Sequence, residues 1–193
     1  MSATPRPTAA SYFDRMWSTG PDPWDHGGRF YEHRKYALTA SVLSADRYHA
    51  VFEPGCATGI LTALLAPRAE RYLATDRHER AVAVTRQRVE AMPHVAVRQG
   101  AIPDDWPDAT FDLVVLSEVL YYLDAAGVSA CLDRAAASTV GGAELVAVHF
   151  REPVPEHTLS GDAVHDLIAG HPAWRREVDH RESRFLLEVF RRR

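Results

Sequence analysis

The stretch VFEPGCATGI, residues 51–60, decides the fold of this chain. It begins as an apolar run and then places Glu53, Gly55 and Gly59 where a buried strand turns into a helix. Because glycine has no Cβ, the backbone at positions 55 and 59 can pass close to a bound molecule. The helix that opens near Ile60 leaves unpaired N–H groups beside the same loop. The stretch therefore predicts a ligand-binding turn after the first strand of an α/β sheet.

Apolar runs and amphipathic segments alternate from residue 49 onward. Strands are predicted at 49–54, 71–76, 95–100, 111–118 and 144–150, and helices at 60–69, 79–91 and 127–140, with two further helices ahead of them at 11–20 and 30–43. Apolar strands that are separated by helices are typical of a parallel sheet covered on both faces. The tail differs, because 174–183 and 184–193 are predicted as two strands joined by a short turn. The sequence thus predicts a mostly parallel sheet that ends in an antiparallel hairpin.

The bulk composition narrows the class of protein. With 193 residues, the chain is long enough for one sizeable core and short for two. Its net charge of −4 argues against nucleic acid as a partner, and no apolar run is long enough to span a bilayer. Two cysteines, Cys56 and Cys131, favour a reducing compartment, so we expect a cytoplasmic protein. Residues 1–10 lack the apolar core of a secretory signal. We expect a disordered leader there and a single domain over 11–193.

Two classes of cofactor compete for the glycine loop. A dinucleotide fingerprint requires G-x-G-x-x-G, but from position 55 the chain reads GCATGI, with Ala57 in the second glycine slot and Ile60 in the third. Side chains at these positions would crowd a pyrophosphate, which weakens the hypothesis of an NAD(P)-dependent oxidoreductase. The spacing E-x-G-x-x-x-G is instead that of the loop in S-adenosylmethionine-dependent methyltransferases, whose cofactor carries no phosphate.

The next two strands supply candidate contacts for that cofactor. Asp76 closes the second predicted strand, where its carboxylate can accept hydrogen bonds from both ribose hydroxyls. The alternative for Asp76 is an N-cap of the following helix. After the third strand, Ala101 and Ile102 stand where adenine is expected, and they can hold the ring by one backbone hydrogen bond and by apolar contact. Asp104 or Asp105 can substitute in that role, or both can be solvated loop residues.

Several further stretches resemble one family. They are DPW (22–24), YEHRKYAL (31–38), EPGCATGILTALLAP (53–67), ATD (74–76), FDLVVLSEVLYYL (111–123), GG (141–142), VAVHFR (146–151) and GDAVH (161–165). With them, nearly the whole chain from residue 12 resembles the class I methyltransferases of the NodS type. The resemblance implies a Rossmann-like, seven-stranded methyltransferase sheet with the N-terminal helices as a lid. It also implies S-adenosyl-L-methionine as cofactor and a small-molecule acceptor, such as the amine of an amino sugar.

The cofactor contacts expected from the loop and from the resemblance form one set. They are Arg34, Glu53, Gly55, Cys56, Gly59, Asp76, Ala101, Ile102 and Ser117. The role that the resemblance implies for Arg34 is a two-bond grip on the carboxylate of the cofactor's methionine end. The alternative for Arg34 is a place on the solvent face of a helix. A cofactor-binding module without catalysis also stays open, and the protein is expected to be a monomer or a homodimer.

Candidate catalytic residues follow the fourth and fifth predicted strands. Glu118 can hold an ammonium acceptor or take its proton, and its alternative role is a hydrogen bond to the N-terminal helix or to the cofactor's amino group. His149 ends the fifth strand and can titrate near neutral pH. Asp162 and His165, three apart on a predicted helix, can pair so that the carboxylate orients the imidazole as a base, unless Asp162 is an N-cap. The histidines and cysteines show no metal-ligand spacing, so no metal is expected.

Overall fold

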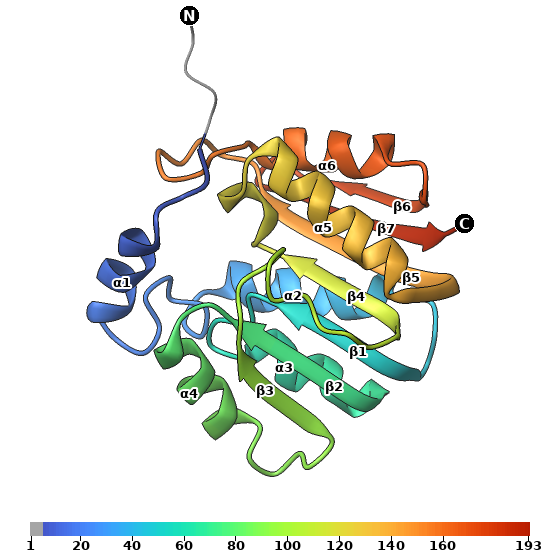
Figure 1. Ribbon diagram of the computed structural model, residues 1–193. Coiled ribbons are helices and arrows are strands. Elements are labelled where there is room, and N and C mark those ends of the chain that lie inside the picture. The colour runs from blue at the N-terminus through green and yellow to red at the C-terminus, as the bar shows by residue number, and fades with distance from the viewer. Residues whose placement is uncertain (1–5) are drawn as a thin grey trace, which may run out of the picture.

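The computed structural model describes residues 6–193 as one seven-stranded sheet with helices on both faces (Figure 1). The strands are β1 (Tyr48–Pro54), β2 (Ala69–Asp76), β3 (Val95–Gln99), β4 (Phe111–Ser117), β5 (Thr139–Phe150), β6 (Trp174–Arg181) and β7 (Phe185–Arg192), in the order β3-β2-β1-β4-β5-β7-β6. The strands β1 to β5 pair in parallel, and β7 runs antiparallel to both β5 and β6. The predicted mostly parallel sheet with a C-terminal antiparallel hairpin is confirmed.

Six α-helices and two short 3-10 helices surround the sheet within the described residues. They are α1 (Ala10–Ser18), α2 (Phe30–Val42), α3 (Ile60–Leu65), α4 (Glu79–Arg88), α5 (Ala125–Ala137) and α6 (Gly161–Gly170), with η1 (Ala66–Arg68) and η2 (Leu120–Tyr122). One face of the sheet packs against α5 and α6, and the other against α2, α3 and α4. Figure 1 shows α1 apart from both layers, beyond the carboxyl ends of the central strands.

The two layers follow from the alternation of side chains along each strand. On β1, Val51 packs into the core on the α2–α3 face, and its neighbour Phe52 packs into the core on the α5–α6 face. The Phe52 side chain is fully buried and contacts the rings of Trp106 and Phe111, with centroids 4.9 and 5.3 Å away. Because both faces are covered, the strand is apolar without alternation, as the sequence predicted.

Several element boundaries differ from the sequence prediction, among them those of α5 and β5. The helix expected over 127–140 is α5, which begins at Ala125 behind the Asp124 cap and ends at Ala137. Thr139 already pairs with Phe111, so β5 begins there. Of the leader expected at 1–10, residues 1–5 lie outside the described part of the chain. The described part is ordered, because the Thr8 amide donates to the Tyr122 carbonyl at 2.8 Å and the Thr8 hydroxyl donates to the Glu156 carbonyl.

The strand order reverses between β1 and β4. From β1 the sheet extends through β2 and β3 on one side, and through β4 and β5 on the other. In open α/β sheets, ligands bind outside the carboxyl ends of the strands at such a point. The loops that leave Pro54 and Ser117 border this crevice. None of the helices between residues 6 and 193 has the length and apolar character needed to cross a membrane.

Truncating the side chain of Phe52 tests the core. The Phe52→Ala variant should lose about 3–5 kcal/mol of unfolding free energy, because it opens a cavity between Trp106 and Phe111. The matched change Phe30→Ala removes a side chain that is 81% exposed and should cost less than about 0.5 kcal/mol. Urea unfolding followed by circular dichroism measures both values. Equal losses in the two variants would contradict this packing.

Candidate active site

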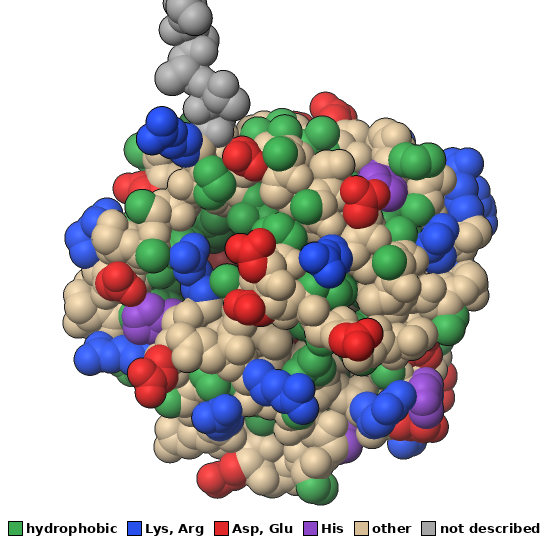
Figure 2. Space-filling view, viewed as in Figure 1, with side chains coloured by type: hydrophobic (Ala, Val, Ile, Leu, Met, Phe, Trp, Pro, Cys, Tyr) green, Lys and Arg blue, Asp and Glu red, His purple; other side chains and the backbone are tan. Residues whose placement is uncertain are grey.

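A cavity of about 290 Å³ opens at the reversal of the strand order. Figure 2 shows it as a hollow with hydrophobic side chains inside, between α1 and the carboxyl ends of the strands. Its walls include most of the cofactor contacts expected from the sequence: Glu53, Gly55, Cys56, Asp76, Ala101, Ile102 and Ser117. The structure therefore brings together residues from the ends of four successive parallel strands. Arg34 and Gly59 do not line this cavity.

The glycine loop turns sharply because Gly55, Ala57 and Gly59 all have positive φ angles, a conformation that favours glycine. Gly55 has φ +75° and lines the cavity, and a Cβ there would lie 2.9 Å from Val119 Cγ2. Gly59 has φ +70°, and a Cβ there would lie 2.8 Å from Thr85 Cγ2. Gly55 thus shapes the cavity wall, whereas Gly59 permits the close approach of α3 to α4. The expected direct contact from Gly59 is not what the structure shows.

Glu53 places a buried carboxylate at the base of the cavity. Its Oε2 accepts hydrogen bonds from Thr62 Oγ1 at 2.6 Å and Tyr72 Oη at 2.8 Å. Burial, only partly offset by these two hydroxyls, raises the pKa of Glu53 to about 7. Its other oxygen, Oε1, accepts no hydrogen bond within residues 6–193, so it is available to a donor in the cavity.

Asp76 holds the loop and faces the cavity at the same time. Its Oδ2 accepts from the Ala57 amide at 3.0 Å, and its Oδ1 accepts from the His78 amide at 2.9 Å. The N-cap of α4 is His78, whose Nδ1 accepts from the Arg80 amide. The alternative that Asp76 caps this helix is therefore wrong. Each carboxylate oxygen has a second lone pair, and burial raises the pKa of Asp76.

In the loop after β3, the structure corrects the hydrogen bond expected between Ala101 and a ring. Ala101 and Ile102 line the cavity, but the Ala101 amide already donates to Asp105 Oδ2 at 2.9 Å. The expected hydrogen bond from this amide to a ring is not available. Asp105 is exposed and occupied in this way, and neither it nor Asp104 lines the cavity. Apolar contact with Ile102 is the interaction that remains for a ring at this place.

Arg34 points away from the cavity, which corrects a second expectation. Its guanidinium makes two hydrogen bonds to the Glu182 carboxylate, at 2.7 and 2.6 Å. This pair joins α2 to the turn between β6 and β7 at the surface. The alternative reading, an arginine on the solvent face of a helix, is the one the structure bears out.

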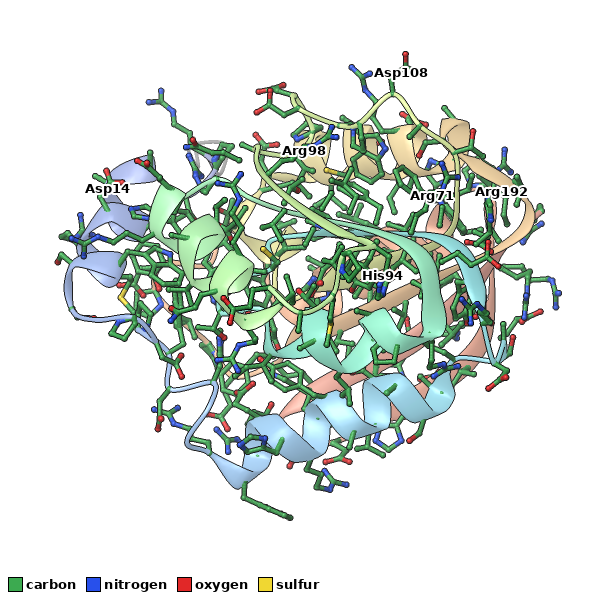
Figure 3. The ribbon with its side chains drawn as sticks, turned by 90° about the horizontal axis from the view of Figure 1, so that it is seen from below. Asp14, Arg71, His94, Arg98, Asp108 and Arg192 are labelled. Atoms are coloured by element: carbon green, nitrogen blue, oxygen red, sulfur yellow. The ribbon has the colours of Figure 1, made fainter. Side chains whose placement is uncertain are left out.

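Aromatic residues ahead of α2 form the lid of the cavity. Trp17 stacks on His78 at 5.7 Å, and Trp24 stacks on His26 at 5.7 Å, with the two indoles edge to face. Arg80 also donates to the Trp17 carbonyl at 2.7 Å. Seen from below, α1 with Asp14 stands beside the start of α4 (Figure 3), and Asp14 Oδ1 lies 3.6 Å from His78 Nε2. The N-terminal segment thus closes one side of the cavity, as expected of a lid.

A buried ion cluster also lines the cavity. Lys35, the only lysine of the chain, lies with its Nζ 2.6 Å from Glu118 Oε1 and 2.8 Å from Glu32 Oε2. The second oxygen of Glu118 accepts hydrogen bonds from the Tyr121 hydroxyl and, at 3.1 Å, from the Phe150 amide. Sequence reasoning missed Lys35 and Glu32, although both belong to the quoted YEHRKYAL stretch.

These contacts settle what Glu118 can do. Its backbone has φ +55°, a left-handed conformation that a residue other than glycine rarely adopts. Burial alone would raise the pKa of Glu118, but Lys35 and the hydrogen bonds from Tyr121 and Phe150 lower it. Glu118 is therefore a carboxylate at neutral pH, with both oxygens in use. Of the roles weighed for Glu118, the structure shows the hydrogen bond to an N-terminal helix, which Lys35 of α2 donates.

His149 and His165 form a buried chain behind the cavity. The Leu120 amide of η2 donates to His149 Nε2 at 3.3 Å, and His149 Nδ1 lies 3.1 Å from His165 Nε2. His165 Nδ1 in turn lies 2.8 Å from Glu188 Oε2, and Glu188 Oε1 accepts from two exposed arginines, Arg176 and Arg181. Because Leu120 is the donor, each imidazole carries its proton on Nδ1.

The structure corrects the catalytic roles expected for three residues, His149, His165 and Asp162. Neither His149 nor His165 lines the cavity, and both are buried. Asp162 does not orient His165, because the Arg151 guanidinium holds it at 3.0 and 2.9 Å near the surface. The N-cap of α6 is Ser160, so the capping alternative for Asp162 is wrong as well. His149 and His165 instead fix the backbone of η2, which carries Tyr121.

The hydrogen-bond chain from His149 to His165 predicts that the imidazole of His149 stays neutral. Burial first, and then the neighbouring His165, His157 and Lys35, lower the pKa of His149 well below its ordinary value. His149 should therefore keep the neutral Nδ1–H tautomer at pH values well below the reference pKa of a histidine. Long-range ¹⁵N–¹H NMR spectra recorded against pH measure this, with the exposed His33 in the same spectra as control. A His149 that gains charge between pH 6 and 7 would contradict the chain.

Comparison with known proteins identifies a family that this chain matches. The family model described as Nodulation protein S (NodS) matches residues 15–138. Nodulation protein S of Sinorhizobium fredii is 34% identical over 104 residues, which are 53% of this chain and 48% of that protein. That of Bradyrhizobium diazoefficiens is 36% identical over 104 residues, 53% of this chain and 49% of that protein. The chain thus spans about half the length of the curated relatives it matches.

Two solved structures resemble this chain over most of its length. A candidate methyltransferase from Pseudomonas syringae is 41% identical and covers 85% of this chain and 100% of its own, with a TM-score of 0.76. The N-methyltransferase NodS from Bradyrhizobium japonicum, crystallised with S-adenosyl-L-homocysteine, is 25% identical and covers 94% of this chain and 97% of its own, with a TM-score of 0.84. Since the family model matches more than half of the sequence, this chain belongs to the Nodulation protein S (NodS) family.

Proposed function

We propose that this protein is an S-adenosylmethionine-dependent methyltransferase that acts on a small-molecule amine. The observation that carries the proposal is the cavity at the reversal of the strand order, into which β1 and β2 bring the carboxylates of Glu53 and Asp76 beside the glycine loop. Membership of the NodS family supports it, and so does the likeness to an N-methyltransferase solved with S-adenosyl-L-homocysteine.

The residues in the cavity fit an adenosyl sulfonium cofactor. Asp76 ends β2 with a free lone pair on each oxygen, which suits the two ribose hydroxyls. Glu53 Oε1 suits the ammonium group of the methionine end, and Ile102 offers apolar contact to adenine. When bound, this cofactor supplies an electrophilic methyl group, so the protein has only to position the acceptor and manage its proton.

The nicotinamide alternative fits the loop less well. Ala57, in the second glycine slot, has φ +48° and donates its amide to Asp76 Oδ2, so this amide is not free for a pyrophosphate. Ile60, in the third slot, presents a side chain that lines the cavity. A binding module without catalysis is also disfavoured, because the cavity extends past Ser117 into a second half lined by Tyr31, Glu118, Phe150 and His157.

An amine is the acceptor class that this second half favours. Glu32 and Glu118 bring two carboxylates to one ammonium, Lys35, which leaves the buried cluster with one net negative charge. Aromatic rings of Tyr31, Tyr121 and Phe150 stand around it. The net negative charge of this cluster attracts a cationic group, just as the Arg184 guanidinium already lies over the rings of Tyr31 and Phe150, 4.2 and 5.5 Å from their centroids. We further propose that the protein acts in the cytoplasm, where Cys56 and Cys131 stay reduced.

Cofactor binding should depend on Asp76. The Asp76→Ala variant should bind S-adenosyl-L-homocysteine about 1.5–3 kcal/mol more weakly, because it loses charge-assisted hydrogen bonds to the ribose. Isothermal titration calorimetry measures the affinity. The control is Asp104→Ala, the same change at an exposed residue that does not line the cavity, and it should bind as the wild type does.

The melting temperature of the wild-type protein distinguishes the two candidate cofactor classes. Saturating S-adenosyl-L-homocysteine should raise the melting temperature of the wild type, because a ligand of the native state stabilises it, and NAD should not. A stabilisation by NAD alone would reject the proposed function. Transfer of a radiolabelled methyl group to a panel of amines, hydroxyl compounds and sugars then identifies the acceptor.

Cofactor binding should also weaken in acid. Glu53 has a pKa of about 7 in the free protein, and an ammonium ligand favours its carboxylate form. The affinity should therefore be highest above pH 7 and fall as the pH drops through that value, by up to about tenfold per pH unit. Calorimetric titrations between pH 5.5 and 8.5 measure this slope. The Glu53→Gln variant should bind more weakly with a flatter profile, and an unchanged slope in it would assign the pH dependence to another group.

A further inference from the structure

Methylation of an amine releases a proton, and several titratable groups in or behind the cavity are already engaged or are not bases at neutral pH. Glu118 is ionised and accepts hydrogen bonds on both oxygens, and Glu32 is paired with Lys35. Burial raises the pKa of Tyr31 to about 12 and that of Tyr121 well above the usual tyrosine value, so neither phenol is a base at neutral pH. His149 lies behind the cavity with both nitrogens in use.

His157 is different, because it lines the cavity and its ring is not engaged. It lies in the loop between β5 and α6, and neither of its imidazole nitrogens makes a hydrogen bond within residues 6–193. The ring is nevertheless held in place. It stacks face to face on Tyr121, with centroids 3.7 Å apart and planes 16° apart, and it meets the edge of Tyr122 at 5.1 Å. Its own amide donates to the Val154 carbonyl at 3.0 Å.

His157 also borders a second depression that leads to solvent. We name it the outer groove, and it is lined by Arg6, Thr8, Ala9, Tyr12, Arg15, Pro155, Glu156, His157 and Thr158. His157 therefore borders both the cavity and the outer groove. His26, the second histidine of the cavity, does not border this groove and is enclosed by Trp24 and Tyr36.

We propose that His157 is the general base that takes the proton of the amine acceptor and releases it through the outer groove, a role that rests on the methyltransferase function proposed above. One N–H proton of the ammonium passes to an imidazole nitrogen, and the N–H electron pair stays on the amine as the lone pair that forms the new N–C bond. The electron pair of the C–S bond stays on sulfur. The imidazolium then gives its proton to water in the groove, which restores the neutral ring.

The surroundings of His157 suit this role. Burial lowers the pKa of His157, while Glu118 and Glu156 act in the opposite sense. The other groups that face it are Tyr121 and Tyr122 of η2, His149 of β5, and Tyr12, Arg6 and Arg15 across the outer groove. Because the ring is neutral at pH 7, it accepts a proton there, and the rate of methyl transfer falls as the pH drops through its pKa.

Two variants of His157 separate a base from a stacking ring. The His157→Phe variant keeps an aromatic ring on Tyr121 but accepts no proton, and His157→Gln keeps a polar side chain without a base. With glucosamine as probe amine, both should lose at least about 100-fold in methyl transfer at pH 7. Both should bind S-adenosyl-L-homocysteine within twofold of wild type. The control is His171→Gln, which changes a histidine beside Asp133 that lines neither the cavity nor the outer groove.

A second measurement does not require turnover. In the complex with S-adenosyl-L-homocysteine, the Hε1 NMR signal of His157 should titrate with a pKa below 6.5, and added glucosamine should shift this signal and lower that pKa, because an ammonium then lies beside the ring. A signal that does not titrate, or that glucosamine leaves unchanged, overturns the proposal. So does full activity of His157→Phe. Failure of the wild type to bind S-adenosyl-L-homocysteine would reject the proposed function instead.

Discussion

The ion pair between Lys35 and Glu118 is the contact on which the cavity depends. It joins α2, which lies ahead of the sheet in sequence, to the residue that follows β4, and Glu118 extends the link to η2 and β5 through Tyr121 and Phe150. A buried charge without a partner is strongly destabilising. Neither Lys35 nor Glu118 can therefore move alone, and the left-handed backbone of Glu118 is held where the crevice widens. The ion pair thus ties α2 to the carboxyl ends of β4 and β5.

The two halves of the cavity are distinguished by the partners of their carboxylates. Glu53 is surrounded by hydroxyl groups and keeps a pKa of about 7, whereas Glu118 has an ammonium beside it and stays ionised. Both side chains are carboxylates at the carboxyl end of a parallel strand, so the difference comes from their neighbours and not from their position. The half with Glu53 suits the cofactor, and the half with Glu118 suits the acceptor.

Three histidines near η2 also differ in role because their hydrogen-bond partners differ. His149 and His165 have every nitrogen committed to a hydrogen bond, and this fixes their tautomers and the backbone that carries Tyr121. His157 stacks on the ring of Tyr121, and both of its nitrogens are free of hydrogen bonds within the described residues. A histidine whose nitrogens are all bonded positions its neighbours, and one whose nitrogens face a cavity is free to exchange a proton.

The sequence by itself determined the order of strands and helices, the glycine turn at 55–59, the acidic residues Glu53 and Asp76, and the family, because these depend on local backbone geometry and on periodicity. It misassigned Arg34, Asp162 and His165, since a charged side chain takes its role from whichever partner the fold brings near, and their partners Glu182, Arg151 and Glu188 lie 148, 11 and 23 residues away along the chain. For the same reason it did not reveal Lys35 or His157. Only the tertiary structure decided which charges are buried together and which imidazole faces the cavity, because these contacts join segments separated by dozens of residues.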